Sequence, residues 1–532
     1  MKQKILSILF FAISINSFSQ PVIGKQKTIG GNDVDLLGGL WPTSDGGTIL
    51  GGRSYSYISG EKTEYNRGVD DYWVVKLNAA GKIEWQRTLG GTDVDEILAL
   101  QQTKDGGYIL AGNSLSNPSG DKAENKGVFD CWVIKLNSFG SVEWQRTLGG
   151  DSYEFCNSVQ QTKDGGYIVG CMSISNVSGD KSENSKGGYD FWLLKLDGAG
   201  NKQWDRTLGG SGDEFANQCI QTVEGGYIAV GLSNSNISGD KSQDSRGGFD
   251  FWAVKLDEHG NKQWDATAGG TGDEYVSGVV QTTDGGYALA GASVSNISGE
   301  KTENSRGGFD YWLVKLSSNG KVQFDKTMGG VLDEYGQKVE NTSDGGIIIC
   351  GGSQSNISGE KTENSRGGQD YWVIKLSNKG TIQWDKTIGG DGDDNLLSVK
   401  EVQKDKYLLG GYSTSNISGD KTENSRGADD FWVVNLNYST TLTAASAMNV
   451  TLPTQKNIND RSFFVYPIPA RNVINVRASG QSVFSLSDNS GKIVLTKTIQ
   501  GNGVIDVSTL TTGIYYLKNS TSGTTKTVVV IK

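Results

Sequence analysis

The chain has 532 residues, a formal net charge of −10 and a single His, and glycine occupies 75 positions. The acidic balance argues against nucleic acid as a partner, because the phosphate backbone attracts basic surfaces. One His excludes most His-based catalysis and His-rich metal sites, and the lack of long apolar runs after the N-terminus excludes a polytopic membrane protein.

The N-terminus has the pattern of an export signal. Lys2 and Lys4 precede the apolar run 5–15, and Ser17 and Ser19 follow it. A charged segment, an apolar segment and then small residues are typical of a secretory signal peptide, and the run is too short for a membrane-spanning helix. We therefore expect residues 1–19 to be a signal peptide and the mature chain to be exported.

Internal repeats cover most of the chain. The tetrapeptide Thr-x-Gly-Gly recurs in steps of 59 or 60 residues, and so does a second marker, Asp-x-Trp. The tetrapeptide begins at Thr28, Thr88, Thr147, Thr207, Thr267, Thr327 and Thr387. The second marker places its tryptophans at Trp73, Trp132, Trp192, Trp252, Trp312, Trp372 and Trp432. Seven copies with almost no length drift indicate a repeat architecture.

Each period contains four predicted strands, for which residues 96–147 serve as the example. We expect strands at 96–103, 108–113, 132–136 and 142–147, in that order. A Lys-Asp-Gly-Gly turn joins the first two strands, and a long polar loop joins the second and third. The third strand is almost continuously apolar, which predicts an interior strand, whereas the fourth alternates and predicts an outer edge. Four-stranded antiparallel units at a fixed period predict a β-propeller, with a solenoid as the alternative.

The two ends of the repeat region complement each other. The last period stops after its third strand, at 431–437, and residues 22–28 align with the missing fourth strand. A solenoid would have to cap its open ends, whereas a propeller closes on itself. We therefore predict an all-β fold in which residues 22–437 form a seven-bladed β-propeller closed by its N-terminal strand.

The C-terminal part has a different composition. Residues 438–461 are rich in Thr, Ser, Ala and Asn, as in a linker, and residues 462–532 show short strands with turn signals, as in a small β-sandwich. The landmarks of this last segment are Val465-Tyr466-Pro467-Ile468-Pro469-Ala470, Leu486-Ser487-Asp488, Gly491-Lys492-Ile493-Val494, Gly513-Ile514-Tyr515-Tyr516-Leu517 and the terminal strand 526–532.

These landmarks resemble the C-terminal sorting domain (type A) of cargo exported by the type IX secretion system of Bacteroidetes. Ile468 departs from that family, which prefers Asn between the two prolines. The resemblance implies that the type IX machinery recognises residues 462–532 and removes them on passage through the outer membrane. It also implies that the rest of the chain is extracellular or attached to the outer-membrane surface.

Charged residues recur once per repeat in the loops predicted to share one face of the propeller. An acid stands seven positions after each Thr-x-Gly-Gly threonine: Asp35, Asp95, Glu154, Glu214, Glu274, Glu334 and Asp394. A base precedes a glycine in the long loop: Arg67, Lys126, Lys186, Arg246, Arg306, Arg366 and Arg426. A lysine recurs earlier in the same loop: Lys62, Lys122, Lys181, Lys241, Lys301, Lys361 and Lys421.

Three interpretations of these charges stay open. Acids and bases repeated in every blade most often pair and pin loops, so we predict that the acid ring is structural. The bases are the candidate ligand-binding residues, for a glycan or an anion. Calcium bound by Asp240, Asp244 and Asp250 is the third, although an adjacent lysine opposes a cation and the spacing is not that of an EF-hand. We expect no resident metal or other cofactor.

Catalysis requires different groups placed once each, and near-identical blades do not provide them. There is no Gly-x-Ser-x-Gly motif, and His259 lies in a predicted exposed turn.

We interpret Trp41 as filling the channel wall and the Asp-x-Trp tryptophans as core. The five cysteines, Cys131, Cys156, Cys171, Cys219 and Cys350, fall at unlike repeat positions, and we interpret them as small buried apolar residues.

We therefore expect a monomeric, non-catalytic binding, adhesion or scaffold module that meets an extracellular glycan or protein. The alternative is a propeller hydrolase or lyase acting on extracellular glycans. Such an enzyme requires blade-specific polar side chains facing the channel, and no convincing set is evident among the innermost strands.

Overall fold

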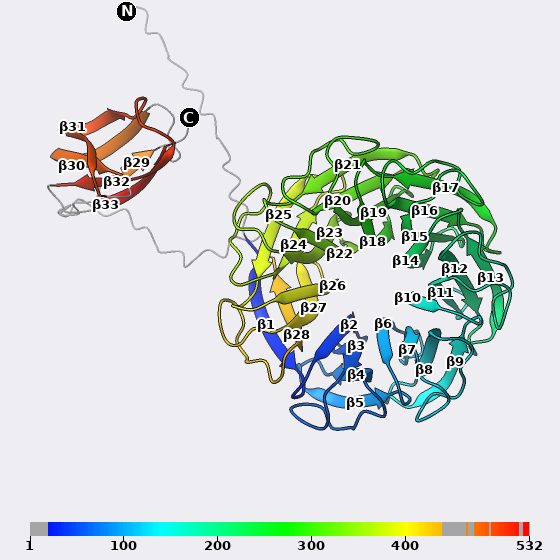
Figure 1. The fold of residues 1–532 in the computed structure, drawn as a ribbon. Coiled ribbons are helices and arrows are strands. Elements are labelled where there is room, and N and C mark those ends of the chain that lie inside the picture. Colours follow the sequence, from blue (N-terminus) through cyan, green and yellow to red (C-terminus); the bar gives the residue numbers. More distant parts are fainter. Residues whose placement is uncertain (1–19, 439–463, 467–472, 489–490, 521–524, 531–532) are drawn as a thin grey trace, which may run out of the picture. The chain divides into compact units, whose positions relative to one another are not determined.

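The computed structural model describes residues 20–438, 464–466, 473–488, 491–520 and 525–530 (Figure 1). The chain divides into two compact units, Met1–Leu442 and Thr443–Lys532. The predicted signal peptide and nearly all of the predicted linker lie outside the described residues. Within the described ranges, no helix is long and apolar enough to cross a membrane.

The first unit consists of seven four-stranded antiparallel sheets around a central channel (Figure 1). We call the strands of each blade A to D from the channel outward. Blade one is β2(Asp35–Pro42), β3(Thr48–Ser54), β4(Asp71–Leu77) and β5(Ile83–Leu89). Blade two is β6(Asp95–Gln102), β7(Tyr108–Ser114), β8(Asp130–Leu136) and β9(Val142–Leu148). Blade three is β10(Glu154–Gln161), β11(Tyr167–Ser173), β12(Asp190–Leu196) and β13(Lys202–Leu208).

The next three blades have the same order. Blade four is β14(Glu214–Gln221), β15(Tyr227–Ser233), β16(Asp250–Leu256) and β17(Lys262–Ala268). Blade five is β18(Glu274–Gln281), β19(Tyr287–Ser293), β20(Asp310–Leu316) and β21(Val322–Met328). Blade six is β22(Glu334–Asn341), β23(Ile347–Ser353), β24(Asp370–Leu376) and β25(Ile382–Ile388).

Blade seven combines the two ends of the repeat region. Its strands are β26(Asp394–Gln403), β27(Lys406–Ser413), β28(Asp430–Asn437) and β1(Val22–Ile29). Strand β1 runs antiparallel to β28, with Thr28 opposite Trp432, so the N-terminal strand supplies the missing strand D. The predicted seven-bladed propeller with N-terminal closure is confirmed. The closure pairs backbone groups that would otherwise leave β28 as an open edge.

Aromatic side chains of the C strands hold neighbouring blades together. The tryptophan of every Asp-x-Trp marker is fully buried, as predicted. Tyr72 of blade one packs against Trp132 of blade two with ring centroids 4.8 Å apart, and its hydroxyl donates to the Trp132 carbonyl at 3.0 Å. The equivalent Phe191–Trp252 pair joins blades three and four at 4.9 Å. Each tryptophan therefore fills the space between two blades, which explains its recurrence in every repeat.

The second unit is a five-stranded all-β fold. Its strands are β29(Phe464–Tyr466), β30(Val473–Ser487), β31(Ile493–Asp506), β32(Gly513–Asn519) and β33(Thr525–Val530), ordered β29-β30-β32-β33 with β31 on β30. Ile474 and Leu486 belong to the same buried cluster, although a flat strand would place them about 40 Å apart. The long strand therefore coils so that its two halves enclose one core, which is the predicted small sandwich.

Candidate functional site

The seven acids of the predicted ring begin the seven A strands, and all are fully buried. Glu274 is typical: its Oε2 accepts the N–H of Gly270 at 2.7 Å, and its Oε1 accepts the hydroxyls of Ser293 and Ser295 at 2.8 and 2.5 Å. The partners are thus backbone and serine groups of the same blade, and no basic side chain is among these bonds. Each carboxyl ties the crossing from strand D to strand A onto the end of strand B.

A second buried carboxyl meets each acid at the junction between blades. Asp250 of blade four accepts the N–H of Arg246 at 2.6 Å, and a Cβ on Gly269 would lie 1.8 Å from Asp250 Oδ1 and 2.8 Å from Glu274 Oε2. The two carboxyl groups therefore occupy the space that a side chain at position 269 would need. This explains why the third residue of Thr-x-Gly-Gly is a glycine. Burial, together with the nearby Glu274 charge, raises the pKa of Asp250 to about 7. These groups are closed to an external ligand.

The seven predicted ligand-binding bases form a ring of salt bridges between blades. Arg246 Nη2 lies 2.6 Å from Glu300 Oε1 of the next blade, and Arg426 reaches Glu61 at 2.6 Å to close the ring. The other pairs are Arg67–Asp121, Lys126–Asp180, Lys186–Asp240, Arg306–Glu360 and Arg366–Asp420. The bases therefore meet a different set of acids from the predicted ring. The signal in the sequence is the acid beside each loop lysine, in Gly-(Asp/Glu)-Lys.

The loop acids considered for calcium have separate partners. Asp240 accepts the ammonium of Lys186 and the N–H of Gly209, and Asp244 accepts the N–H of Ile237. Among the described residues, the only cluster of side chains close enough to ligate one metal ion consists of cysteines. The three carboxylates considered for calcium therefore do not converge on a common point. The loop lysine Lys241 is buried, its ammonium donates to Thr267, and burial lowers its pKa to about 8.

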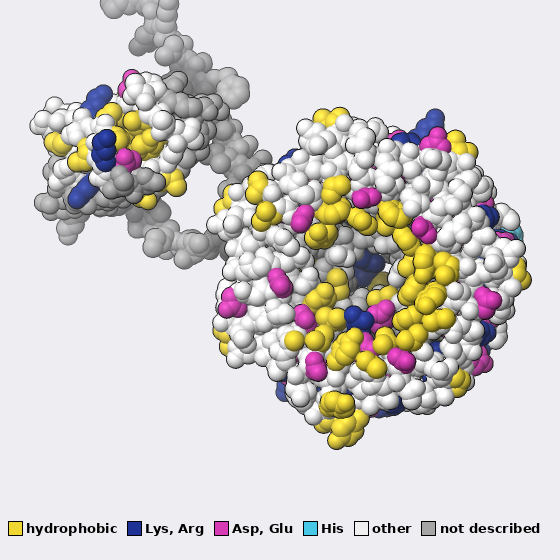
Figure 2. Space-filling view, in the orientation of Figure 1, with side chains coloured by type: hydrophobic (Ala, Val, Ile, Leu, Met, Phe, Trp, Pro, Cys, Tyr) yellow, Lys and Arg dark blue, Asp and Glu magenta, His cyan; other side chains and the backbone are white. Residues whose placement is uncertain are grey.

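Hydrophobic side chains gather around much of one mouth of the channel (Figure 2). Partly exposed aromatic rings recur from blade two to blade six where the A strands begin. They either adjoin a strand-A acid or precede a strand-C aspartate, and we call them the aromatic crescent. Its members are Phe129, Tyr153, Phe155, Tyr189, Phe215, Phe249, Tyr275, Phe309 and Tyr335. Neighbouring ring centroids lie 5.3–6.4 Å apart within two runs, one from blade two to blade four and one from blade five to blade six.

Polar side chains line the rest of this channel mouth, at blades six, seven, one and two. Gln369 donates to Asn395 at 2.6 Å, and Arg53 pairs with Glu96 at 2.7 Å and lies 3.7 Å from Asp70. Burial raises the pKa of Asp70 to about 6, although Arg53 opposes the shift. The mouth thus has an apolar arc and a polar arc. The repeat pattern predicts neither arc, because the residues that flank the strand-A acids differ from blade to blade.

The channel below the mouth contains a cavity of about 320 Å³ lined by the A strands. The position six residues after each strand-A acid differs in nearly every blade: Trp41, Gln101, Gln160, Ile220, Val280, Glu340 and Lys400. Lys400 Nζ lies 4.0 Å from the centroid of a Trp41 ring and pairs with Glu340. Lys338 lines the same cavity, and burial with the Lys400 charge lowers its pKa. This layer holds blade-specific polar residues that the repeat pattern does not predict, and Trp41 contacts one of them, Lys400.

The sequence predicts that His259 is exposed and that the five cysteines are buried. The side chain of His259 is 76% exposed in its turn. All five cysteines are buried and none forms a disulfide bond.

Comparison with known proteins places the tail in a family. The model of the secretion system C-terminal sorting domain matches residues 464–532. The chain is also 22% identical over 447 residues to the regulatory protein FlaEY of Caulobacter vibrioides, an alignment that covers 77% of this chain and 45% of that protein. This chain therefore spans less than half the length of that relative.

Solved structures with similar architecture include BamB from Moraxella catarrhalis and BBS1N in complex with ARL6DN. BamB is 14% identical, with 79% of this chain and all of BamB covered and a TM-score of 0.37. BBS1N is 7% identical, with 80% and 98% covered and a TM-score of 0.43. Neither similarity indicates what this chain binds. The tail determines the destination: the chain is a type IX secretion cargo, a β-propeller with a C-terminal sorting domain that directs it to the cell surface or the extracellular space.

Proposed function

We propose that the mature propeller is a non-catalytic glycan-binding module that holds its ligand at the mouth of the central channel. The observation that carries the proposal is the aromatic crescent, an exposed apolar arc beside a polar one. The other charged features offer less, because the acid ring is buried and each predicted ligand-binding base is already paired with the neighbouring blade.

The chemistry of the mouth suits a carbohydrate. The C–H faces of sugar rings stack on aromatic side chains, and their hydroxyl groups need nearby donors and acceptors. Rings such as Phe215 and Tyr275 provide the stacking surface. Arg53, Glu96 and Asn395 provide donors and acceptors for the hydroxyl groups. Binding sites generally combine such an apolar lining with a few polar groups that fix orientation. The net charge of −10 makes a nucleic-acid strand a poor fit.

A glycan array with the purified full chain tests the proposal, followed by titration of the best oligosaccharide. We expect Phe215→Ala and Tyr189→Ala to weaken binding about tenfold or more each. Phe139→Ala is the matched control, because Phe139 is 78% exposed but lies in the turn between β8 and β9. The absence of any glycan ligand, or equal affinity in the crescent variants and the control, would overturn the proposal. Loss of a protein partner in those variants, with no glycan bound, would overturn it in favour of protein docking.

A second candidate is a hydrolase or lyase acting on extracellular glycans, and the channel cavity favours it. Lys338, Glu340 and Lys400 are an acid and two bases placed once in the ring, as general acid–base catalysis requires. Incubation of the full chain with polysaccharides, with detection of new reducing ends or unsaturated products, tests this activity. Turnover that disappears in Glu340→Gln or Lys338→Met would establish an enzyme. Binding without turnover would exclude these residues from catalysis on those polysaccharides.

A further inference from the structure

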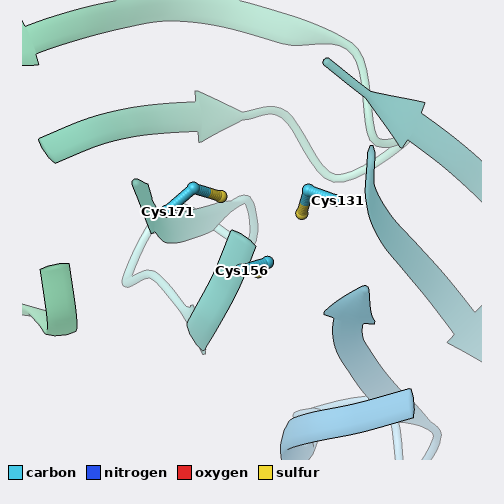
Figure 3. Close-up of side chains that lie close together, drawn as sticks. All are labelled: Cys131, Cys156 and Cys171. Carbon is cyan, nitrogen blue, oxygen red and sulfur yellow. The ribbon is translucent and has the colours of Figure 1, made fainter. Parts of the chain in front are cut away.

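Three of the five cysteines meet at one point between blades two and three (Figure 3). Cys131 lies on β8, Cys156 on β10 and Cys171 on β11. Their sulfur atoms all lie within 4.8 Å of one another, and all three residues are fully buried. Cys219 and Cys350 are equally buried but belong to other parts of the core.

Packing explains part of this arrangement. Cys131 occupies the position that is Tyr or Phe in the other six blades, and Cys171 occupies a position that is Gly in the others. At the next junction a Cβ on Gly231 would lie 2.6 Å from the Phe191 ring. An aromatic ring from one blade and a glycine from the next therefore belong together, and two cysteines replace that pair by filling the space of the ring.

Packing does not explain the third sulfur. Cys156 lies directly opposite Cys171 in the strand register. The same position in the other blades holds Leu37, Ile97, Ala216, Val276, Gly336 and Leu396. Because several small or apolar residues are accepted at this position, the need to fill space does not select a thiol there. The three residues share the ability to ligate through sulfur.

We propose that Cys131, Cys156 and Cys171 form a three-sulfur site for a soft monovalent cation, with Cu(I) as the expected occupant. With metal–sulfur bonds of about 2.3 Å, sulfur atoms at the corners of a triangle are about 4 Å apart. The three sulfur atoms are already close to that spacing. Structural zinc takes four ligands, and no His or carboxylate joins this cluster among the described residues. Thiolates in a site with no oxygen or nitrogen ligand favour Cu(I).

Binding at this site is a ligand exchange without electron transfer. Each thiol that becomes a thiolate releases one proton to solvent, and copper enters and remains as Cu(I). Because all three side chains are closed to solvent, the ion has to enter before blades two and three close. Loading is therefore coupled to folding, and loss from the folded protein should be slow.

Anaerobic refolding of the full chain with Cu(I) and a competing chelator tests the site. We expect one copper per chain by atomic absorption, with sulfur-only coordination by X-ray absorption spectroscopy. Cys156→Ser should weaken binding about a hundredfold or more, since even an outer partner of a metal ligand contributes tenfold to a hundredfold. Cys219→Ser and Cys350→Ser are the matched controls and should bind as the wild type does.

A double variant separates a metal site from simple packing. Cys131→Phe with Cys171→Gly recreates the Phe191–Gly231 pair of the next junction, so it should fold with the wild-type circular dichroism spectrum and bind no copper. Absence of copper from the wild type would overturn the proposal. Equal copper in the wild type, Cys156→Ser and the double variant would also overturn it, because the metal would then lie elsewhere.

Discussion

The buried acids show how a charged residue can serve as a hydrogen-bonding joint. Glu214 accepts the N–H of Gly210 at 2.7 Å and the hydroxyl of Ser233 at 2.7 Å, so its carboxyl replaces water for donors that the fold encloses. Removal of such an acceptor leaves buried donors without a partner, and that penalty exceeds the net gain of an ordinary hydrogen bond.

Glu214→Ala and Glu274→Ala should each lower the free energy of unfolding by about 1–3 kcal/mol. The effects should be similar, because both side chains bind the second glycine of a Thr-x-Gly-Gly motif. Urea denaturation followed by tryptophan fluorescence measures the difference. Arg246→Ala is the control, since its partly exposed salt bridge should contribute only about 0–1 kcal/mol. Wild-type stability together with lost ligand binding in both glutamate variants would show that the ring is functional instead.

The paired carboxyls predict how stability depends on pH. Burial raises the pKa of Asp190 to about 6 and that of Asp250 to about 7. Between about pH 4 and pH 7 the folded state therefore holds more protons at these sites than the unfolded state. The free energy of unfolding must then fall as pH rises through this window. Hydrogen bonds from a threonine hydroxyl, and then from a lysine ammonium, lower the pKa of Asp164 and Asp284 to about 2, so the stabilisation from these two carboxylates is lost only in more acidic solution.

The melting temperature should accordingly be higher at about pH 5.5 than at about pH 8, at constant ionic strength. The lowered pKa of Lys241, about 8, offsets only part of this difference, because the folded state begins to lose that proton only near the upper end of this range. Asp250→Asn should reduce the difference by removing one titrating group. A melting temperature that rises from pH 5.5 to pH 8 would show that the buried carboxyls do not control this range.

Strand β1 is the element that turns an open repeat into a closed ring. Thr28 and Ile29 are fully buried, and β1 pairs with β28 along most of its length. Without β1, strand β28 would present unpaired backbone groups and apolar side chains to solvent, which favours edge-to-edge association.

Deletion of residues 20–29 should therefore lower the melting temperature and cause self-association, detectable by size-exclusion chromatography with light scattering. A synthetic peptide of residues 21–30 should restore the monomer by occupying the vacant edge. A peptide of the same composition in scrambled order is the control. A monomeric deletion variant with wild-type melting temperature would mean that closure by β1 is not required.

At the scale of the whole molecule, folding and delivery reside in separate parts of the chain. The propeller and the tail each have their own buried core, and the sorting-domain match is confined to residues 464–532. All 13 tryptophans precede residue 433, so their fluorescence reports on the propeller alone.

Deletion of residues 464–532 should block appearance at the cell surface while the propeller keeps its fluorescence spectrum and melting temperature. Surface labelling of intact cells measures delivery, and fluorescence of the purified variant measures folding. Surface exposure of the shortened chain would show that another segment directs export. An unfolded propeller would show that the tail contributes to its stability.

The seven blades, the closing strand and the sorting tail can all be predicted from the amino-acid sequence. Each follows from local spacing: a period of 59 or 60 residues, a missing last strand and a set of tail motifs. The fixed spacing predicts repeated blades, because every blade needs a tryptophan at the same place to fill the contact with its neighbour, and all seven are buried.

The pairing of the charges and the contacts among the blade-specific residues, in contrast, depend on the folded ring. Arg426 reaches Glu61, and Lys400 reaches Trp41, because ring closure brings the two ends of the repeat region side by side. The cysteine cluster forms where two consecutive blades pack together, since their facing strands bring unlike repeat positions close to one another. A periodic pattern records what the blades share, whereas the channel and the sulfur cluster depend on how the blades differ and on how their unlike side chains pack together.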